Sequence, residues 1–418
     1  MKKFSILLLI LLVSRVAFPS SILIPMDESQ KNHLKAYGIA YWVLERGVDV
    51  KWLLNYRGGS FMISNIKEIE SECLVRGVSF EIIADAQANL IVDEISSPSQ
   101  NMDVVLMQKA PKIAVYSPPN KQPWDDAVTL VLTYAEIPYE TIYDEEILDG
   151  KLSNYDWLHL HHEDFTGQFG KFFRNYQHMP WYQEDVKTNK DLAQKLGFLK
   201  VSEMKLAVAK TIKSYVANGG FLFAMCAATD TYDIALSAEG EDICESMYDG
   251  DPSTPDFNNH LDFTRTFAFQ NFTVEVDPYK YEFSNIDVTE TRKVQMGSDY
   301  FTLFDFSAKW DPVPTMLCQN HTRIVRGFMG QTTAYDKKLI KPEVLVMGEN
   351  KAANEARYIH GEYGNGTWTF YGGHDPEDYR HAVGDPATDL SLYPNSPGYR
   401  LILNNVLFPA AKKKKQKT

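Results

Sequence analysis

The chain has 418 residues, of which 44 % are hydrophobic and 23 % are charged. This length and composition fit one large or two ordinary globular domains and exclude a disordered chain. The formal net charge of -13 disfavours nucleic acid or an anionic membrane as the main partner, because both would be repelled by most of the protein surface.

Residues 1–20 are predicted to be a signal peptide. Lys2 and Lys3 precede the apolar run FSILLLILLV, which is too short to span a bilayer. We place the cleavage near Ser20 and expect a periplasmic or secreted protein without an integral membrane span. At the other end, residues 412–418 (KKKKQKT) are expected to form a solvated basic tail.

Residues 21–108 are predicted to form an N-terminal α/β lobe. Strand and helix patterns alternate in it, at 22–26, 29–45, 48–54, 65–76 and 78–84. Ser29 is a candidate N-cap of the first helix. Strands that alternate with helices favour parallel pairing, because a crossover helix joins parallel strands. Residues 94–111, which carry Ser, Pro and Gln, are the best candidate for a linker.

Residues 109–411 restart this alternation and are predicted to form a second domain. Its strand patterns lie at 112–117, 139–143, 155–162, 221–226, 343–348, 356–363 and 367–373, and its helix patterns at 125–135, 189–196, 202–217 and 397–407. Between them, residues 240–325 hold strand-like pieces such as FTVEVD and YFTLFDF and no long helix. The predicted fold class is α/β: a doubly wound, mostly parallel sheet with helices on both faces and a β-rich insertion.

The stretch FLFAMCAATDTYDIA, residues 221–235, ends an apolar strand at Cys226 and reopens as a helix. A nucleophile elbow needs small residues two positions before and after the nucleophile, and Ala224 and Ala228 meet that need. A helix capped by Thr229 or Asp230 would point its amides at the thiol, lower the thiol pKa and form part of an oxyanion hole. The alternative is a buried thiol that ends a core strand.

The stretch WTFYGGHDPEDYRHAVGDP places His374 after a strand and a Gly-Gly turn. Ligands bind at the carboxyl ends of the strands in open α/β sheets, so His374 and Cys226 converge if their strands are neighbours. A histidine beside a cysteine can act as its general base, and a carboxylate behind the histidine fixes its tautomer. Candidates for this carboxylate are Asp375, Glu377 and Asp378.

The stretch YDWLHLHHEDFTGQFG carries three histidines at the end of another strand. His159 and His161 fall on one strand face, whereas His162 begins the following loop. We favour a buried structural role for His159. The candidate substrate-binding residues are His161, His162, Glu163, Asp164, Gly167, Ala227 and Thr229. An alternative is a metal site formed by His161 or His162 with His374 and an acidic residue, since neutral imidazoles and carboxylates suit zinc.

The order strand, cysteine, helix, and then a late strand with histidine and carboxylate, resembles the class I glutamine amidotransferase-like superfamily over residues 109–411. The resemblance implies a flavodoxin-like fold and a triad that hydrolyses a carboxamide, with Cys226 as nucleophile, His374 as base and Glu377 as orienting carboxylate. Alanines replace the glycines of the family's G-x-C-x-G, and its H-P-E is one residue longer here, as H-D-P-E. Relatives such as ThuA-like proteins are not catalytic, so a binding or cell-envelope protein is the alternative.

The whole chain also resembles exported bacterial proteins that are called asparagine synthetase B. The activity in that name is not expected here. The glutaminase half of such a synthetase uses an N-terminal cysteine, whereas the first cysteine after the predicted signal is Cys73. The pyrophosphate-binding loop S-G-G-x-D-S is also absent from the sequence.

The four cysteines give no metal-binding pattern. Cys73, Cys226, Cys244 and Cys318 show no C-x-x-C spacing, which argues against a structural zinc site. In an oxidising compartment we expect Cys244 and Cys318 to pair, because both lie in the inserted region. No cofactor is implied, and the expected partner is a small-molecule or peptide-like amide substrate.

Overall fold

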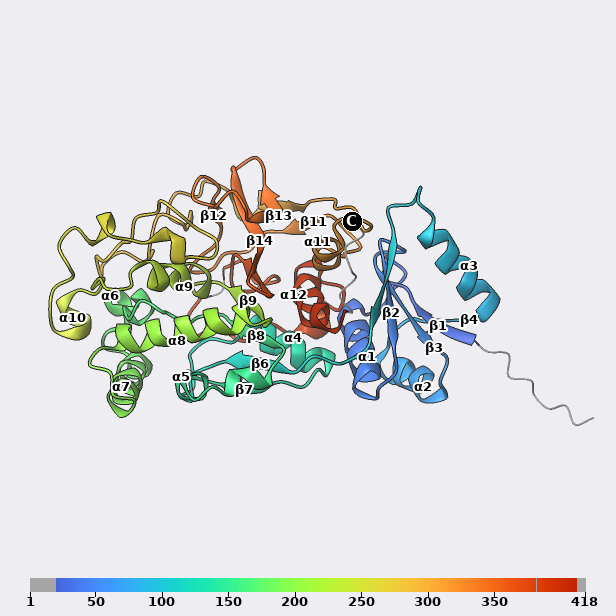
Figure 1. Ribbon diagram of the computed structural model, residues 1–418, viewed down its shortest axis with the longest axis horizontal. Coiled ribbons are helices and arrows are strands. Elements are labelled where there is room, and N and C mark those ends of the chain that lie inside the picture. Colours follow the sequence, from blue (N-terminus) through green and yellow to red (C-terminus); the bar gives the residue numbers. More distant parts are fainter. Residues whose placement is uncertain (1–19, 381, 412–418) are drawn as a thin grey trace, which may run out of the picture.

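The computed structural model describes residues 20–380 and 382–411 and contains two β-sheets (Figure 1). The predicted signal peptide, apart from Ser20, and the predicted basic tail lie outside the described residues. Within these two described ranges, no helix has the length and apolar character needed to cross a membrane.

The N-terminal sheet has five strands. They are β1 (Ser20–Ile24), β2 (Val50–Leu54), β3 (Ser60–Ser64), β4 (Glu81–Ala84) and β5 (Asp103–Met107). Their order is β4-β1-β3-β2-β5, and all neighbours are antiparallel, so the predicted parallel pairing is wrong. β1 and β2 do run in the same direction across a helix, but the β2–β3 hairpin places β3 between them. This is the split βαβ arrangement of ferredoxin-like sheets.

Three helices accompany this sheet: α1 (His33–Glu45), α2 (Lys67–Arg76) and α3 (Asp85–Ser96). α1 begins at His33 because Asn32, and not Ser29, caps it by accepting the N–H of Lys35. Ser29 instead hydrogen-bonds to Asp27 in the preceding turn. The end of α3 and the whole of β5 lie within residues 94–111, so the connection to the larger sheet is only residues 108–112.

The larger sheet has ten strands. They are β6 (Ile113–Tyr116), β7 (Glu140–Ile142), β8 (Trp157–Leu160), β9 (Phe221–Met225), β10 (Tyr300–Leu303), β11 (Ile324–Arg326), β12 (Tyr335–Asp336), β13 (Leu345–Asn350), β14 (Glu355–Tyr363) and β15 (Gly366–Tyr371). The order is β11-β10-β13-β14-β15-β9-β8-β6-β7, with β12 paired to β14. Strands β7, β6, β8, β9 and β15 are parallel neighbours in that order.

The other half of the larger sheet is antiparallel, so the sheet is mixed and not mostly parallel. The strands predicted at 343–348 and 356–363 exist as β13 and β14. Short connections at 351–354 and 364–365 join β13, β14 and β15. Such connections can only link antiparallel strands, because a parallel pair needs a crossover of a dozen or more residues.

Helices lie on both faces of the parallel strands (Figure 1). Ile113 and Val115 of β6 face a core formed with α1, α4 (Ala127–Ala135) and α12 (Pro397–Leu407). Ala114 and Tyr116 face the opposite core, formed with α5 (Asp144–Leu148), α8 (Val201–Ala217) and α9 (Ala228–Ser237). This alternation follows from the period of two in a strand that is buried on both sides.

The region predicted as a β-rich insertion contains less strand than expected. Between α9 and β10, FTVEVD forms one isolated bridge, from Val274 to Ser284, and α10 (Ser246–Asp249) is the longest helix of this segment. Phe267, Phe269 and Phe272 are nevertheless buried. Their apolar side chains pack against the larger sheet, and Phe269 makes one isolated bridge, to Ile340.

The two sheets share one hydrophobic core through α1, which packs on α4 and α12. Figure 1 shows the N-terminal sheet at one end of the molecule with α1 toward the helices of the larger sheet. Arg400 of α12 donates hydrogen bonds to the carbonyls of Met26 and Gly58, at 3.0 and 2.7 Å. The rings of His33 and His321 stack with centroids 4.4 Å apart.

All four cysteines are free thiols in the structure. The Cys244 thiol donates to the Thr166 carbonyl at 3.2 Å, whereas Cys318 lies beside the Met347 carbonyl, with the sulfur 4.0 Å from the oxygen. The predicted disulfide between Cys244 and Cys318 is therefore wrong.

Candidate active site

Cys226 and His374 follow neighbouring parallel strands of the larger sheet. Met225 at the end of β9 pairs with Tyr371 at the end of β15, so both segments leave the sheet at the same carboxyl edge. His162, just after β8, leaves at that edge too. Cys226, His162 and His374 line one cavity of about 290 Å³, which we call the cysteine cavity.

The backbone of Cys226 forms a tight turn between β9 and α9. Its φ of 51° is left-handed, a conformation that is costly for a residue with a side chain and is often kept at functional sites. The sulfur accepts the backbone N–H of Gln331 at 3.2 Å. Burial raises the pKa of the Cys226 thiol to about 11, although backbone N–H groups, that of Ala227 included, favour the thiolate. The predicted lowering of this pKa is therefore wrong in direction.

The start of α9 differs from the predicted capping. Ala227 is the N-cap residue, so neither Thr229 nor Asp230 caps the helix. Thr229 donates its hydroxyl to the Cys226 carbonyl at 2.7 Å, and Asp230 accepts the hydroxyl of Thr332 at 2.9 Å. Both side chains are fully buried and support the turn at Cys226.

One loop holds both Cys226 and His374 in place. Besides the Gln331 contact to sulfur, the carbonyl of Met329 accepts the backbone N–H of His374 at 3.0 Å. Gly330 lies against the same backbone, where an added Cβ would stand 2.8 Å from the His374 nitrogen. A side chain at Gly330 would therefore displace His374.

Asp375 and Glu377 make their observed contacts toward the start of α12. The carboxylate of Asp375 accepts the backbone N–H of Glu377 at 2.9 Å. Burial raises the pKa of Glu377, and a hydrogen bond to Ser396 opposes that rise. Burial and the Asp375 carboxylate raise the pKa of Tyr399. Orientation of His374 by either carboxylate therefore stays a prediction.

Three histidines, His161, His162 and His374, form what we call the histidine cluster. Each offers a ring nitrogen, and these nitrogens lie within 4.8 Å of one another. The His162 ring centroid is 3.8 Å from that of His161 and 4.7 Å from that of His374. His161 is fully buried and His374 is 6 % exposed. Burial lowers the pKa of His162 well below its ordinary value, which keeps its imidazole neutral and available as a ligand.

Asp126 orients the histidine cluster from behind. One carboxylate oxygen lies 3.1 Å from Nδ1 of His161 and 3.0 Å from Nε2 of His159. Burial alone would raise the pKa of Asp126, but the two histidines hold it well below its ordinary value. A carboxylate this close to the ring of His161 is the arrangement of carboxylate–histidine–metal sites. His159 is fully buried, as predicted.

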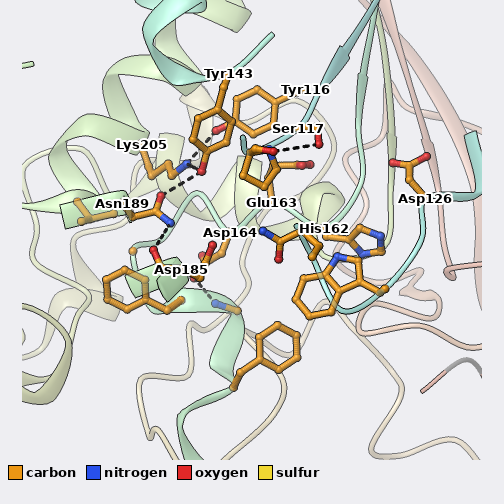
Figure 2. A pocket seen from close by; sticks show the side chains of 18 of the residues that line it. Tyr116, Ser117, Asp126, Tyr143, His162, Glu163, Asp164, Asp185, Asn189 and Lys205 are labelled. Atoms are coloured by element: carbon orange, nitrogen blue, oxygen red, sulfur yellow. Dashed lines mark hydrogen bonds between the residues drawn. The ribbon is translucent and has the colours of Figure 1, made fainter. Parts of the chain in front are cut away.

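A second cavity of about 130 Å³, which we call the acidic chamber, adjoins the cysteine cavity (Figure 2). Trp124, His162 and Phe172 line both. Glu163 is one of its acidic residues and accepts the backbone N–H of His161 at 2.6 Å. Burial raises the pKa of Glu163 to about 8.

The loop after Glu163 closes the acidic chamber. Asp164 accepts the backbone N–H groups of Thr166 and Gly170, at 2.7 and 2.9 Å. Gly167 has a φ of 85°, and a Cβ there would stand 2.9 Å from Ser202. Only glycine fits this turn, which brings the backbone of Gly167 to the wall of the chamber.

Three residues that shape the site were not predicted from the sequence: Asp126, Gln331 and Lys205. Asp126 precedes the apolar run AVTLVL, which is an N-cap signal, and it does cap α4. Its second role toward His161 has no sequence signature. Gln331 and Lys205 lie far along the chain from the histidines, and their spacing gives no signal.

No protein-family model matches the chain, and no curated protein matches its sequence. Among solved structures, two cytoplasmic proteins from Salmonella typhimurium align over 72 % of this chain and all of theirs, at 11 % and 12 % identity with TM-scores of 0.34 and 0.36. Gan42B, a GH42 β-galactosidase, aligns over 64 % of this chain and 28 % of its own, at 12 % identity with a TM-score of 0.28.

Proposed function

We propose that the protein is a metal-dependent hydrolase of an amide-type substrate, with zinc or a similar divalent metal held by His161, His162 and His374. The observation that carries this proposal is the convergence of three ring nitrogens within 4.8 Å. Asp126 lies against the ring of one of them. Three histidine ligands leave the fourth position of a tetrahedral metal open to water, as catalytic zinc sites require.

The chemistry needs only water and the amide. His161, His162 and His374 would hold the metal, and a metal held there would supply the Lewis acidity that activates water as a nucleophile at neutral pH. The oxygen forms a bond to the carbonyl carbon and the C–N bond breaks. The proton released from water ends on the leaving nitrogen, so that the products are a carboxylic acid and an amine.

The sheet supports a site at this position. Numbered in chain order, the five parallel strands run 2-1-3-4-5, the order of flavodoxin-like sheets, which bind ligands at the carboxyl ends of their strands. This order is also what the resemblance to the class I glutamine amidotransferase-like superfamily implies. The signal-like residues 1–20 support an extracytoplasmic location for the activity.

The second candidate is a cysteine amidohydrolase with Cys226 as nucleophile and His374 as base. The left-handed φ of Cys226 and the N–H group of Gln331 on its sulfur favour it. We rank it second because the thiol pKa is raised rather than lowered. A binding protein without turnover is the remaining alternative.

The test measures metal content by mass spectrometry and amide hydrolysis in parallel. We expect about one zinc per chain, and loss of both metal and activity in His162→Ala and His374→Ala. The matched control is His260→Ala, since His260 is exposed and pairs with Glu241 at 3.2 Å. Circular dichroism shows whether each variant has folded.

Cys226→Ala separates the candidates. Metal-dependent hydrolysis predicts that this variant keeps its zinc and most of its activity. Activity that survives a chelator but disappears in Cys226→Ala would establish the cysteine mechanism instead. A folded protein that takes up no divalent metal would overturn the metal proposal.

A further inference from the structure

The acidic chamber is lined by more acidic than basic side chains. Five carboxyl residues line it, Asp125, Asp126, Glu163, Asp164 and Asp185, against one lysine, Lys205. Figure 2 shows Glu163, Asp164 and Asp185 between Lys205 on one side and His162 on the other.

Lys205 has no donor left for an anionic ligand. Its ammonium donates to Asp144 at 2.7 Å, to the Tyr116 hydroxyl at 2.8 Å and to the Tyr143 hydroxyl at 3.2 Å. An ammonium has three N–H groups, so these partners use all of them. Lys205 is therefore neutralised by Asp144 and does not serve as an anion-binding group.

Asp185 shows that the chamber holds acid without enough nearby positive charge. Burial raises the pKa of Asp185, and Lys205 lowers it only partly. A positively charged ligand group would supply the positive charge that this carboxyl group lacks.

Aromatic rings form the wall that faces the histidine cluster. Trp124 and Phe172 line the chamber with ring centroids 5.2 Å apart, and Phe169 lines it too. Ring faces attract ammonium groups, and an aromatic wall beside carboxylates is a recurring way to bind them. This observation is independent of the acidic residues and points to the same kind of ligand.

We propose that the acidic chamber binds the free ammonium group of the substrate, which is therefore an amino-acid amide or a short peptide. Because His162 lines both cavities, an amino group held in the chamber leaves the neighbouring amide beside the histidine cluster. This inference rests on the proposed hydrolysis for its substrate class. The binding of an ammonium group does not depend on turnover.

The kinetic test compares L-alanine p-nitroanilide with its N-acetyl derivative. We expect at least a tenfold higher kcat/KM for the free amine, and a loss of most of that preference in Asp185→Asn through a raised KM. The matched control is Asp191→Asn on the same helix, α7 (Pro180–Lys195), where Asp191 is exposed and pairs with Lys187. Equal kcat/KM for the two substrates would overturn the proposal while leaving the hydrolase in place.

A binding test works without catalysis. Calorimetry with the metal-free protein compares n-butylammonium with 1-butanol, and we expect binding of the ammonium only, weakened at least fivefold in Asp185→Asn. Ammonium binding without hydrolysis of any amide would refute the hydrolase and support the chamber as a binding site. Equal affinity for ammonium and alcohol would refute the chamber proposal whatever the activity.

Discussion

Asp126 lies 3.1 Å from Nδ1 of His161 through one carboxylate oxygen and caps helix α4 through the other. The capping oxygen accepts the N–H groups of Val128 and Thr129, at 2.7 and 2.9 Å. One side chain thus caps a helix and lies against the ring of a cluster histidine. A substitution at Asp126 can therefore affect the start of α4, the proposed metal affinity, or both.

Asp126→Asn should weaken metal binding and leave the fold largely intact. Asparagine caps helices about as well as aspartate, but it lacks the negative charge beside the His161 ring. Loss of such a second-layer carboxylate typically lowers metal affinity about 10- to 100-fold. Competition with a chromogenic chelator measures the affinity. Unchanged affinity in a folded variant would contradict the orienting role of Asp126.

Lys205→Met should destabilise the protein by about 3–5 kcal/mol, because it leaves the buried Asp144 carboxylate without its partner. Lys205 and Asp144 are 2.7 Å apart, with side chains 5 % and 0 % exposed. The double variant with Asp144→Asn should recover part of this loss, since no buried charge remains. Urea unfolding measures the free energy of unfolding of both variants, with Lys187→Met at an exposed ion pair as the control that should leave it nearly unchanged. A double variant less stable than Lys205→Met would contradict this account.

The stacked pair of His33 and His321 should make the contact between the two sheets sensitive to acid. Burial, and then the Arg400 guanidinium, lowers the pKa of His33 from 6.5 to about 4 and that of His321 to about 3. Both rings are neutral in the folded protein above these values, whereas the unfolded chain takes up protons below about pH 6.5. Stability is therefore complete above pH 6.5 and is lost as the pH falls toward 4.

His33 alone accounts for a loss of up to about 3 kcal/mol in the free energy of unfolding at low pH. Unfolding free energies at pH 7, 5 and 4 should fall more steeply for the natural protein than for the double variant His33→Gln/His321→Gln. Parallel curves for the two proteins would show that other groups account for the whole acid sensitivity.

The Cys226 thiol should react slowly with iodoacetamide at neutral pH. With its pKa raised to about 11, only about one thiol in 10,000 is ionised at pH 7. The labelling rate should rise roughly tenfold for each pH unit up to pH 9. Cys226→Ala gives the background from the other three cysteines. A rate that levels off below pH 8 would instead favour the cysteine mechanism.

Much of the arrangement around the site follows from local patterns. The sequence pattern predicts the apolar strands that end before Cys226 and His374. Polar residues that follow the carboxyl ends of parallel strands meet at one edge of the sheet. α12 begins and ends where the pattern Pro397–Leu407 predicts. The three histidines at the end of β8 were also recognised, although a metal was only the alternative interpretation.

Other features depend on contacts that spacing does not encode. The alternation in residues 21–108 is compatible with both a parallel sheet and a split βαβ sheet, and only the β2–β3 hairpin decides between them. The raised pKa of Cys226 comes from burial in the folded protein, and the loop that reaches its sulfur lies 105 residues further on, at Gln331. The charge of Lys205 is cancelled by Asp144, 61 residues away.

The hydrogen bonds from Arg400 to the carbonyls of Met26 and Gly58 also constrain how the chain can be made. The N-terminal sheet with α1 and the last helix, α12, pack into one core. A nascent chain therefore cannot complete this core until Leu407 has emerged. Until then the side of α1 that packs on α12 is uncovered, and the chain depends on delayed folding or on a chaperone. Shortening the protein within α12 should therefore cost solubility of the whole chain and not only of its end.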